Sequence, residues 1–116
     1  MDPTIRVGEY CFNALTPFDF LINHLPARGG LYVFLILDPK NGFRVIYIGE
    51  TKDYRERLTK QHHKYALCRL KAGGLGLFLA ICPLPYATEV ERKRAESRLI
   101  QTVQPEYNDQ CVERVA

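Results

Sequence analysis

The sequence predicts an α/β fold of the α+β kind, a small three-stranded, mostly antiparallel sheet flanked by helices. Its 116 residues suffice for one domain with a single hydrophobic core. Two apolar, β-rich runs on either side of a turn sequence predict a hairpin, and helical periodicity follows them. The longest apolar runs are far shorter than the roughly 20 residues of a membrane-spanning helix. We therefore expect a soluble protein with no membrane partner, and the lack of a secretory signal favours the cytoplasm.

The first elements are a short helix and the hairpin. Residues 1–29 are expected to form an N-terminal extension, in which Thr16, the proline after it and an apolar segment predict a short capped helix packed on the core. Residues 31–38 and 43–48 then read as two strands. The Asn41-Gly42 pair between them is typical of a tight hairpin turn.

The second half of the chain predicts a helix, a strand and a helix. Residues 53–71 carry apolar side chains at helical spacing, which predicts one continuous helix. Residues 75–82 are nearly all apolar and predict a third, buried strand. The last helix should begin at Thr88, because Glu91 three residues later completes a capping box, and it should stop before Pro105.

Positive charge is concentrated on one segment. The whole chain has a net charge of +3, whereas the segment from Lys52 to Lys71 holds seven Lys or Arg against two acids, a local net charge of +5. On a continuous helix Arg57, Lys60, Lys64 and Lys71 would form a basic ridge within about 60°, suited to a phosphate backbone. The alternative is an ordinary solvated helix face. The side chains predicted to contact nucleic acid are Lys52, Arg55, Lys60, Lys64 and Lys71.

One carboxylate occupies an unusual position on the last helix. Glu96 lies between Ile100 and Val103 on the apolar side of the helical wheel. Since an ionised carboxylate is costly to bury alone, Glu96 must pair, bind a metal or face a cleft. An ion pair with Arg92, four residues earlier, and a functional role are both open.

The four cysteines do not have the spacing of a zinc site. They lie apart along the chain, with no C-x-x-C pair and no matching pair of histidines. We expect them to be reduced thiols, in the core or near the surface: Cys11, Cys68, Cys82 and Cys111.

The hairpin strands carry two tripeptides, Gly30-Leu31-Tyr32 and Tyr47-Ile48-Gly49, which resemble the motifs of the GIY-YIG nuclease superfamily. Three further residues stand at the spacing of that family. Arg57 follows the second tripeptide at its usual offset, Glu96 begins a segment similar to the E-x-x-L-I pattern, and Asn108 ends one similar to P-x-Y-N. The resemblance covers residues 29–108 and implies a metal-dependent DNA endonuclease that hydrolyses phosphodiester bonds by water attack.

The resemblance also implies a role for each of these residues. Tyr32 and Tyr47, expected to face each other across the hairpin, would include the general base, with the choice between them open. Arg57 would stabilise the charged transition state. Glu96 would hold a single divalent ion, Mg²⁺ or Mn²⁺. Asn108 would orient the tyrosines or the substrate backbone.

Two positions depart from the family's pattern. Many relatives have histidine or tyrosine four residues after the arginine, where this chain has Gln61, and many have lysine where it has Glu50. His62 could serve as an accessory residue only if the helix were distorted, and His63 is expected to be solvated. These departures leave open an alternative class, a nucleic-acid-binding module that keeps the fold and has lost the chemistry.

The substrate is predicted only in outline. A nuclease-like domain over residues 30–110, followed by a tail at residues 111–116, leaves little room for a part that reads a DNA sequence. We therefore expect recognition of duplex or branched DNA by structure or ends, or with the help of a protein partner or a homodimer. DNA repair, a mobile element and defence are the candidate contexts.

Overall fold

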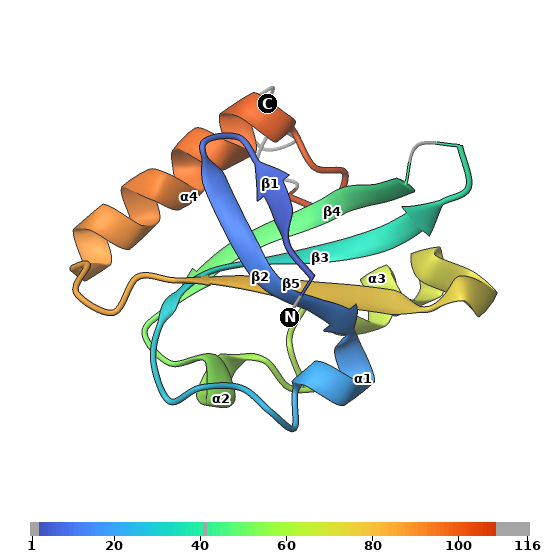
Figure 1. Cartoon of the computed structure of the whole chain (residues 1–116), viewed down its shortest axis with the longest axis horizontal. Coiled ribbons are helices and arrows are strands. Elements are labelled where there is room, and N and C mark those ends of the chain that lie inside the picture. The colour runs from blue at the N-terminus through green and yellow to red at the C-terminus, as the bar shows by residue number, and fades with distance from the viewer. Residues whose placement is uncertain (1–2, 41, 109–116) are drawn as a thin grey trace.

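The computed structural model describes residues 3–40 and 42–108, and its centre is an antiparallel sheet (Figure 1). The expectations for the Asn41 turn residue, for Cys111 and for the tail lie outside these residues. The sheet order is β1-β2-β5-β3-β4, so β3 is an interior strand between β5 and β4, and β4 is an edge strand. The strands are β1 (Ile5–Val7), β2 (Tyr10–Pro17), β3 (Gly30–Asp38), β4 (Gly42–Thr51) and β5 (Leu77–Pro83).

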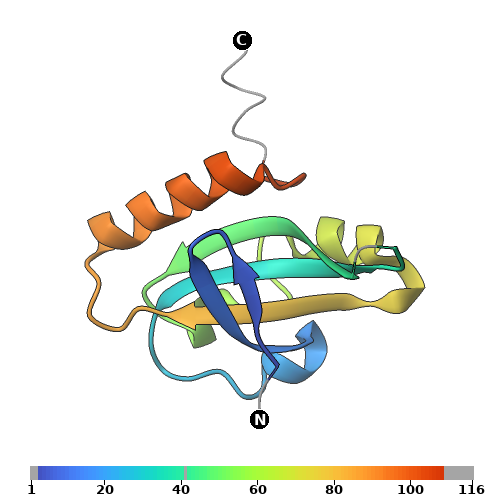
Figure 2. The same ribbon diagram turned by 45° about the horizontal axis from the view of Figure 1, so that its top comes forward.

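The helices cover both faces of the sheet. Figure 2 shows α4 on one side of the sheet and α1 and α2 on the other. Alternate residues of β3 serve the two sides: Leu31 packs toward α4, whereas Tyr32 packs toward the short helices. Because both faces are covered, β3 is apolar along most of its length instead of alternating. The helices are α1 (Phe18–Leu21), α2 (Tyr54–Arg57), α3 (Tyr65–Ala72) and α4 (Glu89–Val103), with a 3₁₀ turn at Gly73–Leu75.

The fold class is as predicted, but the sheet has five strands and not three. The two additional strands, β1 and β2, come from the N-terminal segment, and β2 pairs with β5. They were missed because β2 does not alternate regularly: Ala14 has a φ of 58° and the pairing register shifts between Asn13 and Thr16. The short helix in this segment is present, with Pro17 at its N-cap and no side-chain cap.

The predicted hairpin and third strand are confirmed. β3 pairs with β4 on one side and with β5 on the other, both antiparallel. A bulge interrupts the first ladder: Ile46 falls between the pairs Phe34–Tyr47 and Leu35–Val45. Bulges of this kind often occur beside functional sites, where they redirect a side chain.

The predicted continuous helix over residues 53–71 is wrong. The chain leaves α2 at Leu58, whose backbone is not helical, and passes through turns until α3 begins at Tyr65. Side chains stabilise these turns: the Thr59 hydroxyl accepts the Gln61 amide and His62 Nδ1 accepts the Lys64 amide. The prediction of a basic ridge required one continuous helix. It is therefore wrong as well for its four residues, which are Arg57, Lys60, Lys64 and Lys71.

The last helix forms where the sequence places it. α4 begins after Thr88, and the capping box with Glu91 is complete in both directions. Ala95 and Leu99 bury its apolar side against the sheet, and Gln104 ends it in the left-handed conformation. None of the helices within residues 3–40 and 42–108 has the length and apolar character needed to cross a membrane.

Replacing the cap residue of α4 tests this assignment. We expect Thr88→Ala to lower the free energy of unfolding by about 1 kcal/mol, because the Glu91 amide loses its acceptor. Urea denaturation measures the change. Thr102→Ala is the control, since that exposed hydroxyl donates only to its own helix at Arg98, and this variant should differ little from the wild type. Equal losses in the two variants would contradict the assignment.

Candidate active site

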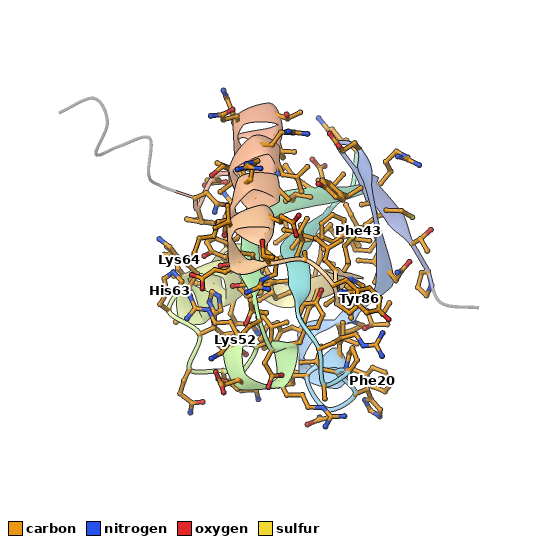
Figure 3. The ribbon with its side chains drawn as sticks, turned by 90° about the vertical axis from the view of Figure 1, so that its left-hand side faces the viewer. Phe20, Phe43, Lys52, His63, Lys64 and Tyr86 are labelled. Carbon is orange, nitrogen blue, oxygen red and sulfur yellow. The ribbon has the colours of Figure 1, made fainter. Side chains whose placement is uncertain are left out.

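A polar cleft of about 550 Å³ lies beside the edge strand, between β4, the segment around α2, and α4. Four of the five residues predicted as catalytic line it: Tyr32, Tyr47, Arg57 and Glu96. Lys52 is exposed on the same cleft, and Figure 3 shows Lys52, His63 and Lys64 on one face of the molecule. Other charged side chains around the cleft are Glu50, Glu56, Glu89, Arg92 and Lys93.

The two tyrosines are diagonal neighbours and do not face each other directly. Tyr32 pairs with Gly49, and Tyr47 pairs with Phe34. Both rings lie on the same face of the hairpin, with their centroids 6.2 Å apart. Tyr32 is thus opposite a residue two positions after Tyr47, and the prediction that the two tyrosines face each other directly is wrong. Both phenols still line the same cleft.

Both phenols are buried enough to favour their neutral form. Burial raises the pKa of Tyr32, and the neighbouring Tyr47 raises it further, while hydrogen bonding and charge from Arg57 oppose the shift. Burial also raises the pKa of Tyr47, followed by the charge of Glu96, with Arg57 again opposing. Arg57 therefore favours the phenolate form of both Tyr32 and Tyr47.

His62 reaches Tyr32, behind the cleft, because the helix is broken. Its ring is only 5% exposed, and Nε2 lies 2.7 Å from the Tyr32 hydroxyl oxygen. Its Nδ1 accepts the backbone amide of Lys64 at 3.0 Å. Burial lowers the pKa of His62 to about 3, with Arg57, His63 and Lys64 adding to the effect, so the imidazole is neutral at pH 7.

His63 also belongs to this group, although the sequence pointed only to a solvated residue. Its side chain is exposed, but Nδ1 accepts the Arg57 guanidinium at 3.1 Å and Nε2 lies 3.5 Å from the Tyr47 hydroxyl oxygen. Its ring stacks on His62, with centroids 4.6 Å apart. Only the turn between α2 and α3 allows adjacent histidines to reach the same site, so helical periodicity could not reveal His63.

Glu50 is compensated by two cations of α4. Arg92 Nε and Lys93 Nζ each donate to its carboxylate at 3.0 Å. Arg92 therefore pairs with Glu50 and not with Glu96, which corrects the ion pair considered from the sequence. The carboxylate at residue 50 is therefore held by two ion pairs.

Glu96 projects from α4 and is half-buried at the cleft. Burial raises the pKa of its carboxyl, and the charge of Glu50 raises it further, whereas Lys93 and Arg57 oppose the shift. Within residues 3–40 and 42–108, no group of three or more His, Cys, Asp or Glu side chains is placed to hold a metal. Glu96 thus shares the cleft with Glu50, Glu56 and Glu89, but among the described residues it is not one member of a preformed metal cage.

The remaining predicted side chains are dispersed. Lys60 pairs with Asp19 at 3.9 Å and Lys71 with Glu106 at 3.6 Å, and Arg55 Nε donates to the Leu25 carbonyl at 2.7 Å. Gln61 is exposed in the turn and does not line the cleft. Of the basic residues predicted to bind nucleic acid, Lys52 is the one that lines the cleft.

Two solved structures resemble this chain. Both are point mutants of the GIY-YIG N-terminal endonuclease domain of UvrC from Thermotoga maritima, each described as bound to its catalytic divalent cation. They match with TM-scores of 0.55 and identities of 26% and 25%, covering 78% of this chain and 93–94% of the domain. The chain has a GIY-YIG-like fold. No family model matches the sequence, and no curated protein matches it.

The glycine of the second tripeptide has a steric reason in this GIY-YIG-like fold. Gly49 lies opposite Tyr32, and a Cβ at residue 49 would overlap Cζ and the hydroxyl oxygen of the Tyr32 ring. The absence of a side chain at this position therefore lets the phenol lie across β4 and reach the cleft.

Asn108 holds the outer side of β4. Its Oδ1 accepts the Ile48 amide at 2.7 Å, and its Nδ2 donates to the Ile48 carbonyl at 2.8 Å. The side chain is buried and does not line the cleft. Because Ile48 follows Tyr47, Asn108 fixes the backbone that carries this tyrosine.

Substituting Gly49 tests the close packing of Tyr32. We expect Gly49→Ala to lower the free energy of unfolding by about 1–3 kcal/mol, since the added methyl group overpacks a buried ring. Chemical denaturation measures the loss. Gly74→Ala is the matched control, because no heavy atom lies within 4 Å of its Cβ position and it should be tolerated. A Gly49→Ala variant as stable as this control would contradict the close packing of Tyr32 on Gly49.

Proposed function

We propose that this protein is a metal-dependent DNA endonuclease that hydrolyses phosphodiester bonds by water attack. The observation that carries the proposal is the meeting of two tyrosine phenols, a guanidinium and a carboxylate in one polar cleft of a GIY-YIG-like fold. The nuclease-like part would span residues 30–110, with residues 1–29 as an extension that completes the sheet. The proposed location is the cytoplasm.

Phosphodiester hydrolysis makes three demands on such a site. Water must lose a proton, the phosphoryl charge must be neutralised, and the leaving oxygen must be stabilised. Arg57 meets the second demand: its side chain is charged at all relevant pH values, reaches the cleft, and presents donors that match phosphate oxygens. The same charge reduces the cost of forming a phenolate at Tyr32 or Tyr47.

Either phenol is suited to exchange a proton with the attacking water. Tyr32 and Tyr47 both line the cleft, and each lies beside a histidine Nε2. A phenol whose pKa is raised by burial is a strong base once it has lost its proton. Nearby positive charge from Arg57 is then needed to make the phenolate accessible. Asn108 would act indirectly, by fixing the strand that carries Tyr47.

The residues of the cleft fit a single divalent cation. Burial and the charge of Glu50 raise the pKa of Glu96, so its ionised carboxylate is destabilised. A bound cation would offset that destabilisation. Mg²⁺ binds to one or two carboxylates and takes its other ligands from water and substrate phosphate, so one glutamate suffices. A bound Mg²⁺ or Mn²⁺ would neutralise phosphoryl charge and assist the leaving oxygen.

The proposed substrate is duplex or branched DNA chosen by structure or ends. Of the charged side chains that line the cleft, Lys52 and Arg57 suit the phosphates of a DNA backbone, a contact that carries no information on base sequence. A protein partner or a second copy of the chain would then supply further targeting. The biological setting would be repair, a mobile element or defence.

The direct test is cleavage of a panel of linear, nicked, flapped and branched DNA in Mg²⁺ or Mn²⁺. We expect the wild type to cleave at least one of them and Glu96→Gln to lose at least about 100-fold in rate, because the carboxylate charge is gone. Glu9→Gln is the control, since Glu9 pairs with Arg98 on the surface and does not line the cleft. Binding by the wild type without cleavage in either metal would favour the binding-module alternative.

A second prediction concerns Lys52, an exposed lysine that lines the cleft. We expect Lys52→Ala to weaken binding to all DNA sequences alike and to reduce the slope of log affinity against log salt by about 1. Fluorescence anisotropy over a range of salt concentrations measures both effects. Lys40→Ala serves as control, because Lys40 is exposed near the opposite end of the hairpin. A change in sequence preference would argue against a phosphate contact.

A further inference from the structure

The hydrogen bonds of His62 determine which of its ring nitrogens carries the proton. A backbone amide can only donate, so the Lys64 amide requires His62 Nδ1 to be the acceptor. A neutral imidazole with an unprotonated Nδ1 carries its proton on Nε2. That nitrogen lies 2.7 Å from the Tyr32 hydroxyl oxygen, so the imidazole donates and the phenol oxygen accepts.

The surroundings of His62 keep it in this state. The ring is 5% exposed and packs edge-on against the aromatic rings of Tyr32, Phe34 and Tyr47. Protonating Nδ1 would point an N–H at the Lys64 amide and place a charge in this apolar group. The charged and titratable neighbours Arg57, His63 and Lys64 all oppose a second proton as well.

This arrangement limits what His62 can do to the phenol. Because Nε2 already carries a proton, His62 cannot accept the Tyr32 proton while the Lys64 hydrogen bond is in place. Because the phenol oxygen accepts from His62, the hydroxyl proton of Tyr32 must point elsewhere. The same Nε2–H would remain bonded to a Tyr32 phenolate and stabilise it.

We propose that His62 is a positioning residue of this site, a neutral hydrogen-bond donor that holds the Tyr32 oxygen in place, with its tautomer fixed by the Lys64 amide. The expected effect of His62 on the cleavage rate rests on the proposed nuclease function. The tautomer of His62 and its hydrogen bond to Tyr32 do not. The donor role is assigned to His62, which is next to Gln61, the residue at the position where many GIY-YIG nucleases have histidine or tyrosine.

The neighbouring histidine shows what is specific to His62. The Arg57 guanidinium also only donates, so His63 Nδ1 is an acceptor and its Nε2–H faces Tyr47 at the longer distance of 3.5 Å. His63 is exposed, and its partner Arg57 is a side chain proposed to bind phosphate. The tautomer of His62 depends instead on a backbone amide within the same turn and does not change when Arg57 engages a substrate.

The first experiment needs no substrate. ¹⁵N NMR of the imidazole nitrogens in the whole protein should show His62 with a protonated Nε2 and an unprotonated Nδ1, unchanged from pH 8 to pH 5. His24 is exposed and provides an internal reference. A protonated Nδ1, or a His62 that titrates in this range, would overturn the proposal whether or not the protein cleaves DNA.

The second experiment separates a donor from a proton acceptor. Gln places an amide N–H near the position of Nε2 and cannot take up a proton, so we expect His62→Gln to keep cleavage within about tenfold of wild type and to keep the shape of the pH profile. His62→Ala should lose about 100-fold, and His24→Gln should behave as wild type. If His62→Gln folds, as judged by circular dichroism, and is as inactive as His62→Ala, the donor role is wrong.

Failure of the proposed function gives a different pattern. If the wild type cleaves no DNA in the panel but NMR shows the expected His62 tautomer, the nuclease proposal fails and the kinetic part of this inference fails with it. If the wild type cleaves and NMR shows the other tautomer, only the role of His62 is overturned. The NMR measurement uses the wild type, so this part of the test does not depend on the folding of either His62 variant.

Discussion

The burial of β3 on both faces is the constraint on which the rest of this structure depends. The residues from Leu31 to Ile36 are all buried, with one set packed toward α4 and the other toward α1 to α3. A strand in this position needs partners on both edges and cover on both sides. The order of the sheet and the placement of every helix follow from meeting that need.

The candidate site lies where this buried strand meets the edge strand of the sheet. β3 contributes Tyr32, the edge strand contributes Tyr47, and the two sides of the sheet contribute Arg57 and Glu96. The groups come from four elements: β3, β4 and α2 follow one another in the chain, whereas α4 comes only after α3 and β5, and each element is held by the core. The chemistry therefore depends on packing, since no single element could bring a phenol, a guanidinium and a carboxylate together.

Much of this organisation could be predicted from the sequence. Two apolar, β-rich runs indicated the hairpin, the two tripeptides indicated its tyrosines, and Thr88 with Glu91 marked the start of α4. Local signals were sufficient there, because an apolar strand run and a capping box depend on neighbouring residues. The five predicted catalytic positions depended on a resemblance to a known family, and the structure brings four of them into the cleft, with Asn108 behind the strand. Their catalytic roles stay predictions.

The errors have physical reasons as well. Tyr54, Leu58 and Cys68 all face the same core, so their spacing matches one helix although α2 and α3 are separate. The break is stabilised by the side chains of Thr59 and His62, which accept the backbone amides of Gln61 and Lys64. Such hydrogen bonds do not change apolar periodicity. β1 and β2 were missed for a related reason, since an irregular strand loses the alternation by which strands are recognised.

The attachment of the segment after α4 to β4 has a consequence for how the protein behaves in a crowded solution. An edge strand offers outward amide and carbonyl groups that can pair with another chain and begin aggregation. Here the Tyr107 amide donates to Ile46 at the bulge, and Asn108 occupies both backbone groups of Ile48. The residues that steady the tyrosine strand therefore also block that stretch of β4 from pairing with a foreign strand. One short segment after the last helix thus links the order of the site to the solubility of the sheet.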